Sequence, residues 1–208
     1  EKRLWAQKRA SAASDQERKY QQAALQADIT LRSAIPDHHP YLEIKGFPEE
    51  KGLVLEDKLL IPMRNVVTNK LQGYQSIRWD AETRKYEKKM LTGMRAKNAV
   101  LYMGNRDFPE CWLVEGFATG LSVLDALQAM YRQDEVWVCF SAGNLSDVSG
   151  LIPGRRVVFA DNDASKTGQK AAESTGLPWV MSPVEGEDAN DYHQRAGLWG
   201  LVRLMRKI

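Results

Sequence analysis

The segment Val157-Val158-Phe159-Ala160-Asp161-Asn162-Asp163-Ala164-Ser165 decides the fold that this sequence predicts. Its first half is β-branched, aromatic and uncharged, as in a strand that is buried on both faces. Asp161 and Asp163 follow at once, so the strand places two carboxylates at its C-terminal end, where open α/β sheets bind their ligands. Two carboxylates this close repel each other, and a divalent cation between them removes the repulsion.

The same arrangement occurs earlier in the chain, where residues 112–116 read Trp-Leu-Val-Glu-Gly and place Glu115 after a short apolar strand. From residue 111 onward, strands and helices alternate. We expect strands at 112–114, 136–140, 156–160 and 178–181, and helices at 118–132, after 141–144, and at 166–175. Short crossovers of this kind require a parallel sheet covered by helices on both faces. Glu115, Asp161, Asp163 and Asp188 are then expected to meet at one edge of that sheet.

The middle of the chain, residues 53–92, has the pattern of β-structure, with strands expected at 58–64, 71–78 and 86–91. Basic residues lie on or beside these strands: Arg64, Arg78, Lys85, Lys88 and Lys89. If they share one face, they form a basic strip that can contact phosphates. Lys and Arg scattered over an ordinary surface would produce the same pattern.

Residues 1–34 contain no Gly or Pro and predict one or two helices. Four basic residues near the start, Lys2, Arg3, Lys8 and Arg9, could contact nucleic acid. A charged helix face exposed to water is the more common meaning of such a run. Residues 197–208 have apolar residues at helical spacing and predict a last helix that packs on the sheet.

Composition sets limits on the class of protein. The chain has 208 residues, 43% of them hydrophobic, and a net charge of +2, which is too small to indicate nucleic-acid binding by itself. No apolar run approaches the ~20 residues of a membrane span. Cys111 and Cys139 lie beside or within predicted buried strands and fit a reducing, cytoplasmic location. His38 and His39 lack further ligands at zinc spacing. The chain begins with Glu, so we expect a piece of a longer protein.

Several kinds of site use an acid pair like Asp161 and Asp163. An EF-hand is excluded because its sixth and twelfth positions would be Lys166 and Ala172 instead of Gly and Glu. A phosphatase of the aspartyl-phosphate type carries its pair on the first strand of the domain, not near its end. An acidic surface turn remains open. Glu115 and Asp188 at neighbouring strand ends favour hard cations that assist phosphoryl or nucleotidyl transfer.

A family resemblance rests on three motifs: residues 112–122, 160–168 and 186–191. Together they resemble the successive motifs of the Toprim domain of primases, topoisomerases and related nucleases. Upstream, four segments resemble the catalytic core of bacterial-type DNA primases, including phage and plasmid versions, in the same order: residues 41–46, 60–65, 88–93 and 101–104. The resemblance covers roughly residues 38–196.

The resemblance implies an α/β fold, with a Toprim-like parallel sheet flanked by helices and preceded by a smaller basic α+β subdomain. The predicted organisation is a helical segment at 1–37, the basic subdomain at 38–108, the Toprim domain at 109–196 and a C-terminal helix at 197–208. The implied activity is that of a DNA primase, a nucleotidyltransferase that makes RNA primers on single-stranded DNA from ribonucleoside triphosphates. The implied cofactor is Mg²⁺ or Mn²⁺, as two ions. A replicative helicase, fused or separate, is an expected partner, and a phage, plasmid or bacterial replicon the expected context.

The resemblance also implies roles for particular residues. Asp161, Asp163 and Asp188 are expected to hold the metals, and Glu115 to bind metal or to act as general base for the attacking hydroxyl. The residues expected to line the template and nucleotide groove are Arg64, Arg78, and Lys88 or Lys89. Asn190 and Asp191 both compete for the last acidic position of the family. A Toprim nuclease and a non-catalytic nucleic-acid-binding module remain alternatives, whereas a topoisomerase would need a large additional domain with a tyrosine nucleophile.

Overall fold

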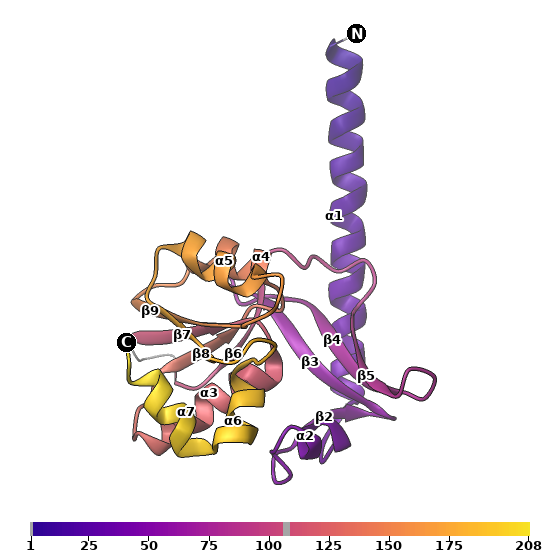
Figure 1. Cartoon of the computed structure of the whole chain (residues 1–208). Coiled ribbons are helices and arrows are strands. Elements are labelled where there is room, and N and C mark those ends of the chain that lie inside the picture. Colours follow the sequence, from indigo (N-terminus) through magenta and orange to yellow (C-terminus); the bar gives the residue numbers. More distant parts are fainter. Residues whose placement is uncertain (1, 106–108) are drawn as a thin grey trace.

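The computed structural model describes residues 2–105 and 109–208. The N-terminal half, residues 2–105, is a long helix followed by a mainly antiparallel sheet (Figure 1). Its elements are α1 (Lys2–Ser33), β1 (Ile35–Asp37), α2 (Pro40–Ile44), β2 (Gly52–Leu55), β3 (Lys58–Asn65), β4 (Leu71–Asp80), β5 (Lys85–Met90) and β6 (Ala99–Met103). β3 lies at the centre and pairs antiparallel with β2, β4 and β6, and β5 extends the sheet beyond β4.

The C-terminal half, residues 109–208, alternates strands and helices. Its elements are β7 (Glu110–Val114), α3 (Phe117–Ala129), β8 (Glu135–Val138), α4 (Ala142–Ser149), β9 (Arg155–Ala160), α5 (Thr167–Thr175), β10 (Trp179–Met181), α6 (Ala189–Ala196) and α7 (Leu198–Met205). The strands β8, β7, β9 and β10 are parallel, as expected from the short crossovers. β6 pairs antiparallel with β8 and so joins both halves into one continuous sheet.

Two hydrophobic cores cover the parallel strands, and β9 shows why this segment folds as a buried strand. Val157 and Phe159 pack in the core that includes residues of α3, α6 and α7. Val158 and Ala160 point to the opposite face and pack in the core formed with α4 and α5. All four side chains are buried. A strand buried on both faces needs a continuous apolar run and not an alternating one, and this is what the sequence has.

The predicted elements are present in the predicted order and differ at their ends, whereas the helices α2 and α6 were not predicted. The N-terminal segment is one helix and not two, and α7 packs in the core beside α3 and α6 as expected. β1, β2 and β6 were not predicted as strands. The predicted boundary at 108/109 adjoins residues 106–108, which lie outside the described residues, as does residue 1. None of the described helices combines the length and the apolar character needed to cross a membrane.

Candidate active site

The C-terminal ends of the parallel strands form the edge at which the predicted acidic residues lie. Glu115 follows β7 and Asp161 follows β9, and these two strands are hydrogen-bonded neighbours. Burial raises the pKa of Asp161 to about 7, and the charges of Asp188 and Glu115 add to the effect. Burial and the charge of Asp163 raise the pKa of Glu115 as well. The structure thus brings the four predicted carboxylates into one electrostatically coupled group.

Asp161 has the features of a cation ligand. Its Oδ1 atom is buried and has no hydrogen-bond partner among the described residues. An unpaired buried carboxylate oxygen is costly, and a hard divalent cation is a suitable partner because it prefers oxygen ligands. Among residues 2–105 and 109–208, however, no three His, Cys, Asp or Glu side chains are gathered closely enough to form a complete metal-binding cluster. Carboxylate oxygens are suitable ligands for a divalent ion. In this structure, however, Asp163 and Asp188 accept hydrogen bonds from neighbouring backbone and side-chain groups.

Asp163 differs from Asp161 because it binds the start of α5. Its Oδ2 accepts a hydrogen bond from the Gly168 amide at 2.8 Å, and its Oδ1 accepts one from the Thr167 amide at 3.1 Å. These amides and the Ser165 hydroxyl lower the pKa of Asp163 to about 2. Asp163 therefore remains ionised and fixes the loop after β9. The Asp163 carboxylate thus has a structural function in the turn that precedes α5.

Gly168 permits the close approach of α5 to this loop. A Cβ atom at this position would lie 2.3 Å from the backbone oxygen of Asp161. No side chain can be accommodated at this distance without moving the loop.

Asp188 begins α6 and is held from two sides. Its side chain accepts a hydrogen bond from the Asp191 amide at 2.9 Å, and the Asp191 carboxylate accepts one from the Asp188 amide at 3.4 Å. The Thr119 hydroxyl donates to Asp188 Oδ2 at 3.0 Å. Asp191 also forms an ion pair with Lys45 at 3.6 Å. Asp188 thus reaches the acidic edge from the N-terminus of a helix, where negative charge is favourable.

Asn190 joins the two halves of the chain, a function that the sequence did not reveal. It is fully buried, and its Nδ2 donates to the backbone oxygen of Lys45 at 2.8 Å and to the Ser122 hydroxyl at 3.0 Å. Of the two candidates for the last acidic position, Asn190 is therefore an interdomain contact, and Asp191 belongs to the cap of α6. The only sequence signal was the presence of Lys45 and Asn190 in two of the quoted motifs.

Lys88 is the basic residue that faces the acidic edge. Lys88 lies opposite Ile77 in the β4–β5 pairing, and Ile77 lies opposite Leu59 in the β3–β4 pairing, so the three side chains share one face of the sheet. The side chains of Ile77 and Leu59 are buried in a core with Tyr41. Lys88 Nζ lies 5.6 Å from the centre of the Tyr41 ring. Its positive charge lowers the pKa of both Glu115 and Asp161 and so opposes the effect of burial. Lys88 is therefore the predicted basic residue whose charge acts on these carboxylates.

Arg78 and Lys89 lie on the other face of the sheet. The pairing places Lys89 beside Ser76 and Arg78 beside Lys58, and these four side chains line a shallow cavity of about 150 Å³. Arg78 pairs with Asp57 at 3.5 Å, and Lys89 with Glu87 at 2.8 Å. The condition for a single basic strip, that these residues share one face, is not met by Lys88 and Lys89, because adjacent residues of a strand point to opposite faces.

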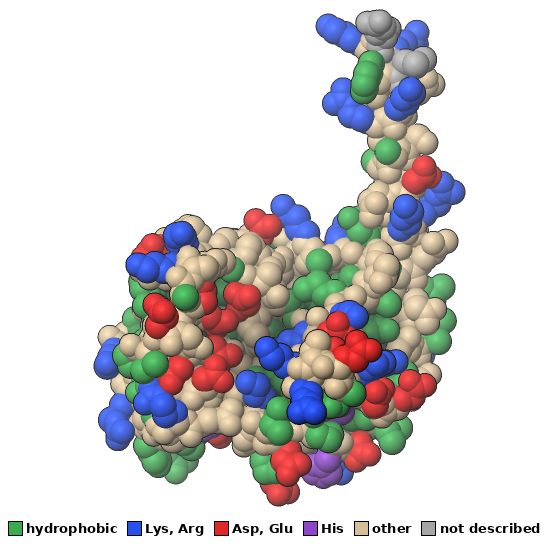
Figure 2. Space-filling model, turned by 45° about the vertical axis from the view of Figure 1, so that its right-hand side comes forward, with side chains coloured by type: hydrophobic (Ala, Val, Ile, Leu, Met, Phe, Trp, Pro, Cys, Tyr) green, Lys and Arg blue, Asp and Glu red, His purple; other side chains and the backbone are tan. Residues whose placement is uncertain are grey.

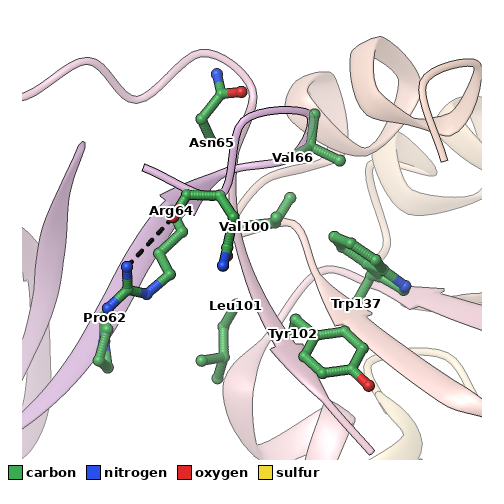
Figure 3. Close-up of a pocket in the computed structure, with 9 residues that line it drawn as sticks. Pro62, Arg64, Asn65, Val66, Val100, Leu101, Tyr102 and Trp137 are labelled. Carbon is green, nitrogen blue, oxygen red and sulfur yellow. Dashed lines mark hydrogen bonds between the residues drawn. The ribbon is translucent and has the colours of Figure 1, made fainter. Parts of the chain in front are cut away.

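Arg64 lines a separate cavity of about 440 Å³ between β3, β6 and β8 (Figure 3). Its guanidinium donates to the backbone oxygen of Asn69 at 3.2 Å. Tyr102 and Trp137 line the same cavity, with their ring centres 5.3 Å apart. None of the four predicted carboxylates lines this cavity. The structure thus brings one of the four predicted basic residues, Lys88, to the acidic edge.

The surface shows the same separation of charge. In Figure 2, acidic side chains gather over the C-terminal half, and Lys and Arg side chains of the neighbouring part lie across a hollow from them. Opposite charges on the two sides of a hollow favour a ligand with negative phosphates, since one side attracts it directly and the other can do so through a cation.

Comparison with known proteins identifies the second half of the chain. Residues 110–198 match the family model of the Toprim domain. These residues form a Toprim domain. The fold of the whole chain is similar to a solved structure described as the structure of the DnaG catalytic core, with a TM-score of 0.52 and 15% sequence identity. This match covers 95% of the present chain and 72% of the other. No curated protein sequence matches the chain.

The comparisons confirm the predicted Toprim domain and show that the fold of the chain is similar to that of the DnaG catalytic core. The structural similarity extends over the N-terminal half as well, because it covers nearly the whole chain. At 15% identity this similarity shows the fold, while the reaction has to be argued from the site.

Proposed function

We propose that the chain is a DNA primase core that joins ribonucleotides on a single-stranded DNA template, with Mg²⁺ or Mn²⁺ as cofactor. The observation that carries this proposal is the placement of Glu115 and Asp161 at the ends of the adjacent strands β7 and β9, where the buried Asp161 Oδ1 has no hydrogen-bond partner among the described residues. The charges of Asp188 and Lys88 also act on the pKa of Asp161. Carboxylates that can hold hard cations, beside a lysine that can bind phosphate, are the groups that nucleotidyl transfer requires. The primase-core fold supports polymerisation over cleavage of nucleic acid.

The residues of this edge would divide the work. Asp161 and Asp188 would hold the divalent ions, which supply charge neutralisation at the phosphates and lower the pKa of the attacking hydroxyl when bound. Lys88 would bind the triphosphate as a point charge. Glu115 is half-buried and its pKa is raised, so it is a stronger base than an exposed carboxylate and can accept the proton of the 3′-hydroxyl. Asp163 would hold the loop in place through its bonds to the α5 amides.

The test is primer synthesis by the Asp161→Asn variant. The full chain is incubated with single-stranded DNA, Mn²⁺ and labelled ribonucleotides, and products are separated by length. We expect the variant to lose product by more than about 100-fold, because the preorganised charge at the reaction centre is removed. Glu173→Gln makes the same chemical change at an exposed position of α5, where the side chain contacts Gln169, and should retain activity. Equal product from Asp161→Asn and the parent would refute the proposal.

The same assay separates the two alternatives. A Toprim nuclease would shorten end-labelled DNA without ribonucleotides, and Asp161→Asn would abolish the shortening. A binding module would give neither product, although it would still bind DNA. Mn²⁺ binding, measured by electron paramagnetic resonance, gives a readout that is independent of turnover, and it should weaken in Asp161→Asn and not in Glu173→Gln.

A further inference from the structure

The N-terminal part of α1 stands clear of the rest of the molecule (Figure 1). The helix spans Lys2–Ser33, and its buried side chains, Ala23 and Ala27, belong to its second half. The middle of the helix is fixed by Arg95, which forms an ion pair with Glu17 and lies 4.6 Å from the centre of the Tyr20 ring. Residues 2–16, here called the arm, are therefore held at one position by a base that is packed on the body.

The arm is basic and carries an exposed aromatic ring. Residues 2–14 include Lys2, Arg3, Lys8 and Arg9 and no acidic residue. Trp5 is 65% exposed, whereas Trp side chains are highly buried on average. At 3.6 residues per turn, Lys2, Trp5, Lys8 and Arg9 fall within an arc of about 120°. One side of the arm thus combines positive charge with an accessible ring, and Lys and Arg side chains surround this end of the helix in Figure 2.

This side of the arm continues the side of α1 that packs on the body. Ala23 follows Trp5 by 18 residues, and Ala27 follows Arg9 by the same number, which corresponds to about five complete turns. Trp5 and Arg9 are therefore in line with the two buried alanines. A chain bound along the body could extend onto the arm without crossing to the other side of the helix.

The composition of the arm decides between possible occupants. A bilayer or a second helix would need an apolar stripe that recurs every turn. Residues 2–19 contain only two large apolar residues, Leu4 and Trp5, which are adjacent and do not form such a stripe. A nucleic-acid strand needs Lys and Arg for its phosphates and an aromatic ring on which a base can stack. The arm has both.

We propose that the arm binds single-stranded nucleic acid through its phosphates, with a base stacked on Trp5. That this strand is the template of primer synthesis rests on the proposed function. The binding itself does not require catalysis. The arm is about 20 Å long at 1.5 Å per residue, so it extends the contact surface well beyond the acidic edge. Because the base of α1 is fixed to the body, binding need not order a flexible segment first.

The experiment measures the salt dependence of DNA binding by the full chain. A fluorescein-labelled oligothymidylate is titrated at several salt concentrations, and fluorescence anisotropy gives the dissociation constant. In the variant Lys2→Ala/Lys8→Ala/Arg9→Ala, the slope of log K against log salt should decrease in magnitude by about 2, because each lost phosphate contact removes about 0.7 on single strands. Alanine also favours helix, so α1 should persist, and circular dichroism checks this.

A matched control removes the same number of cations elsewhere. Arg203, Arg206 and Lys207 are exposed at the other end of the chain, and their triple alanine variant should retain the slope of the parent. Trp5→Ala should weaken binding several-fold and leave the slope unchanged, since stacking releases no counterions. Identical slopes in the arm variant and the parent would overturn the proposal. A change in sedimentation of the free protein with unchanged DNA binding would also overturn it and indicate self-association.

Failure of this proposal can be told apart from failure of the proposed function. The salt slope reports on the arm, and primer synthesis by Asp161→Asn reports on the proposed function; Asp161→Asn should lose synthesis and keep the parental salt slope. If Asp161→Asn loses synthesis but the arm variant keeps its slope, only the arm proposal falls. If the arm variant loses its slope while Asp161→Asn retains activity, only the proposed function falls.

Discussion

The sheet is covered on both faces in the C-terminal half of the molecule and on one face in the β3–β4–β5 part of the N-terminal half. In the Toprim domain, the parallel strands have buried side chains on both faces, and charged residues lie mainly where the strands end. In the N-terminal half, the β3–β4–β5 sheet carries a core on one face and exposed Lys, Arg and Ser side chains on the other. The first arrangement concentrates charge at one buried edge, and the second spreads it over two surfaces. In the Toprim domain, a charged residue reaches the candidate site when it follows the end of a strand. In the N-terminal half, the face to which a residue points decides whether it does so.

The largest difference is expected from removing an aromatic ring in each half. Phe159→Ala, at a fully buried position of β9, should lower the free energy of unfolding by ~3–5 kcal/mol, because a cavity remains in a covered sheet. Trp79→Ala, at a position of β4 that is 48% exposed, should cost less than ~1.5 kcal/mol. Urea titrations of both variants check this. Equal losses would show that the N-terminal sheet is as tightly packed as the Toprim domain.

A smaller effect is expected from a methyl group beside the acidic edge. Gly168→Ala should cost ~1–3 kcal/mol and reduce primer synthesis, because its Cβ would meet the Asp161 backbone oxygen and displace the loop. Gly143→Ala on α4 is the control, since nothing lies within 4 Å of its Cβ. This control should be neutral or slightly stabilising. Thermal unfolding and the primer assay are measured for both variants. Equal stability and equal primer synthesis in Gly168→Ala and Gly143→Ala would show that the contact with the Asp161 backbone is unimportant.

The adjacent lysines of β5 test the separation of faces. Lys88→Ala should lower primer synthesis at limiting ribonucleotide by about tenfold, about 1.4 kcal/mol, because it removes a charge next to Glu115 and Asp161. Lys89→Ala and Arg78→Ala should leave this reaction within about twofold of the parent and affect only the salt dependence of template binding. Reversed results would place the nucleotide on the other face of the sheet.

The smallest effect is expected when the native protein is treated with a thiol reagent, because both cysteines are buried. Cys111 and Cys139 are buried, and burial raises the pKa of the Cys111 thiol to about 12 and that of Cys139 still further from its usual range. A raised pKa keeps the thiol protonated, so labelling of the native protein by a disulfide reagent should stay slow between pH 7 and about 9. A Ser76→Cys variant, beside Lys58, Arg78 and Lys89, should react quickly at the same pH. Rapid labelling of the parent would indicate that the parallel sheet opens readily.

The apolar run at 157–160 was sufficient to predict a strand buried on both faces, and the spacing of later strands was sufficient to predict the parallel sheet. Prediction of the basic surface was less successful. Strand alternation implied that Lys88 and Lys89 point in opposite directions, but nothing local showed which of them faces the acids. β6 was missed because its role as the link between both halves depends on pairing with β3 and β8, which are distant in the chain.

The sequence by itself determined the chemical groups of this protein and their places at strand ends, because both follow from local patterns of apolar and acidic residues. Only the tertiary structure decided how each group is used. Asp161 has an unpaired buried oxygen while Asp163, two residues later, binds the amides of α5, and Asn190 contacts Lys45 across the two halves. These differences arise from contacts between segments far apart in the chain, which a reading of local pattern does not contain.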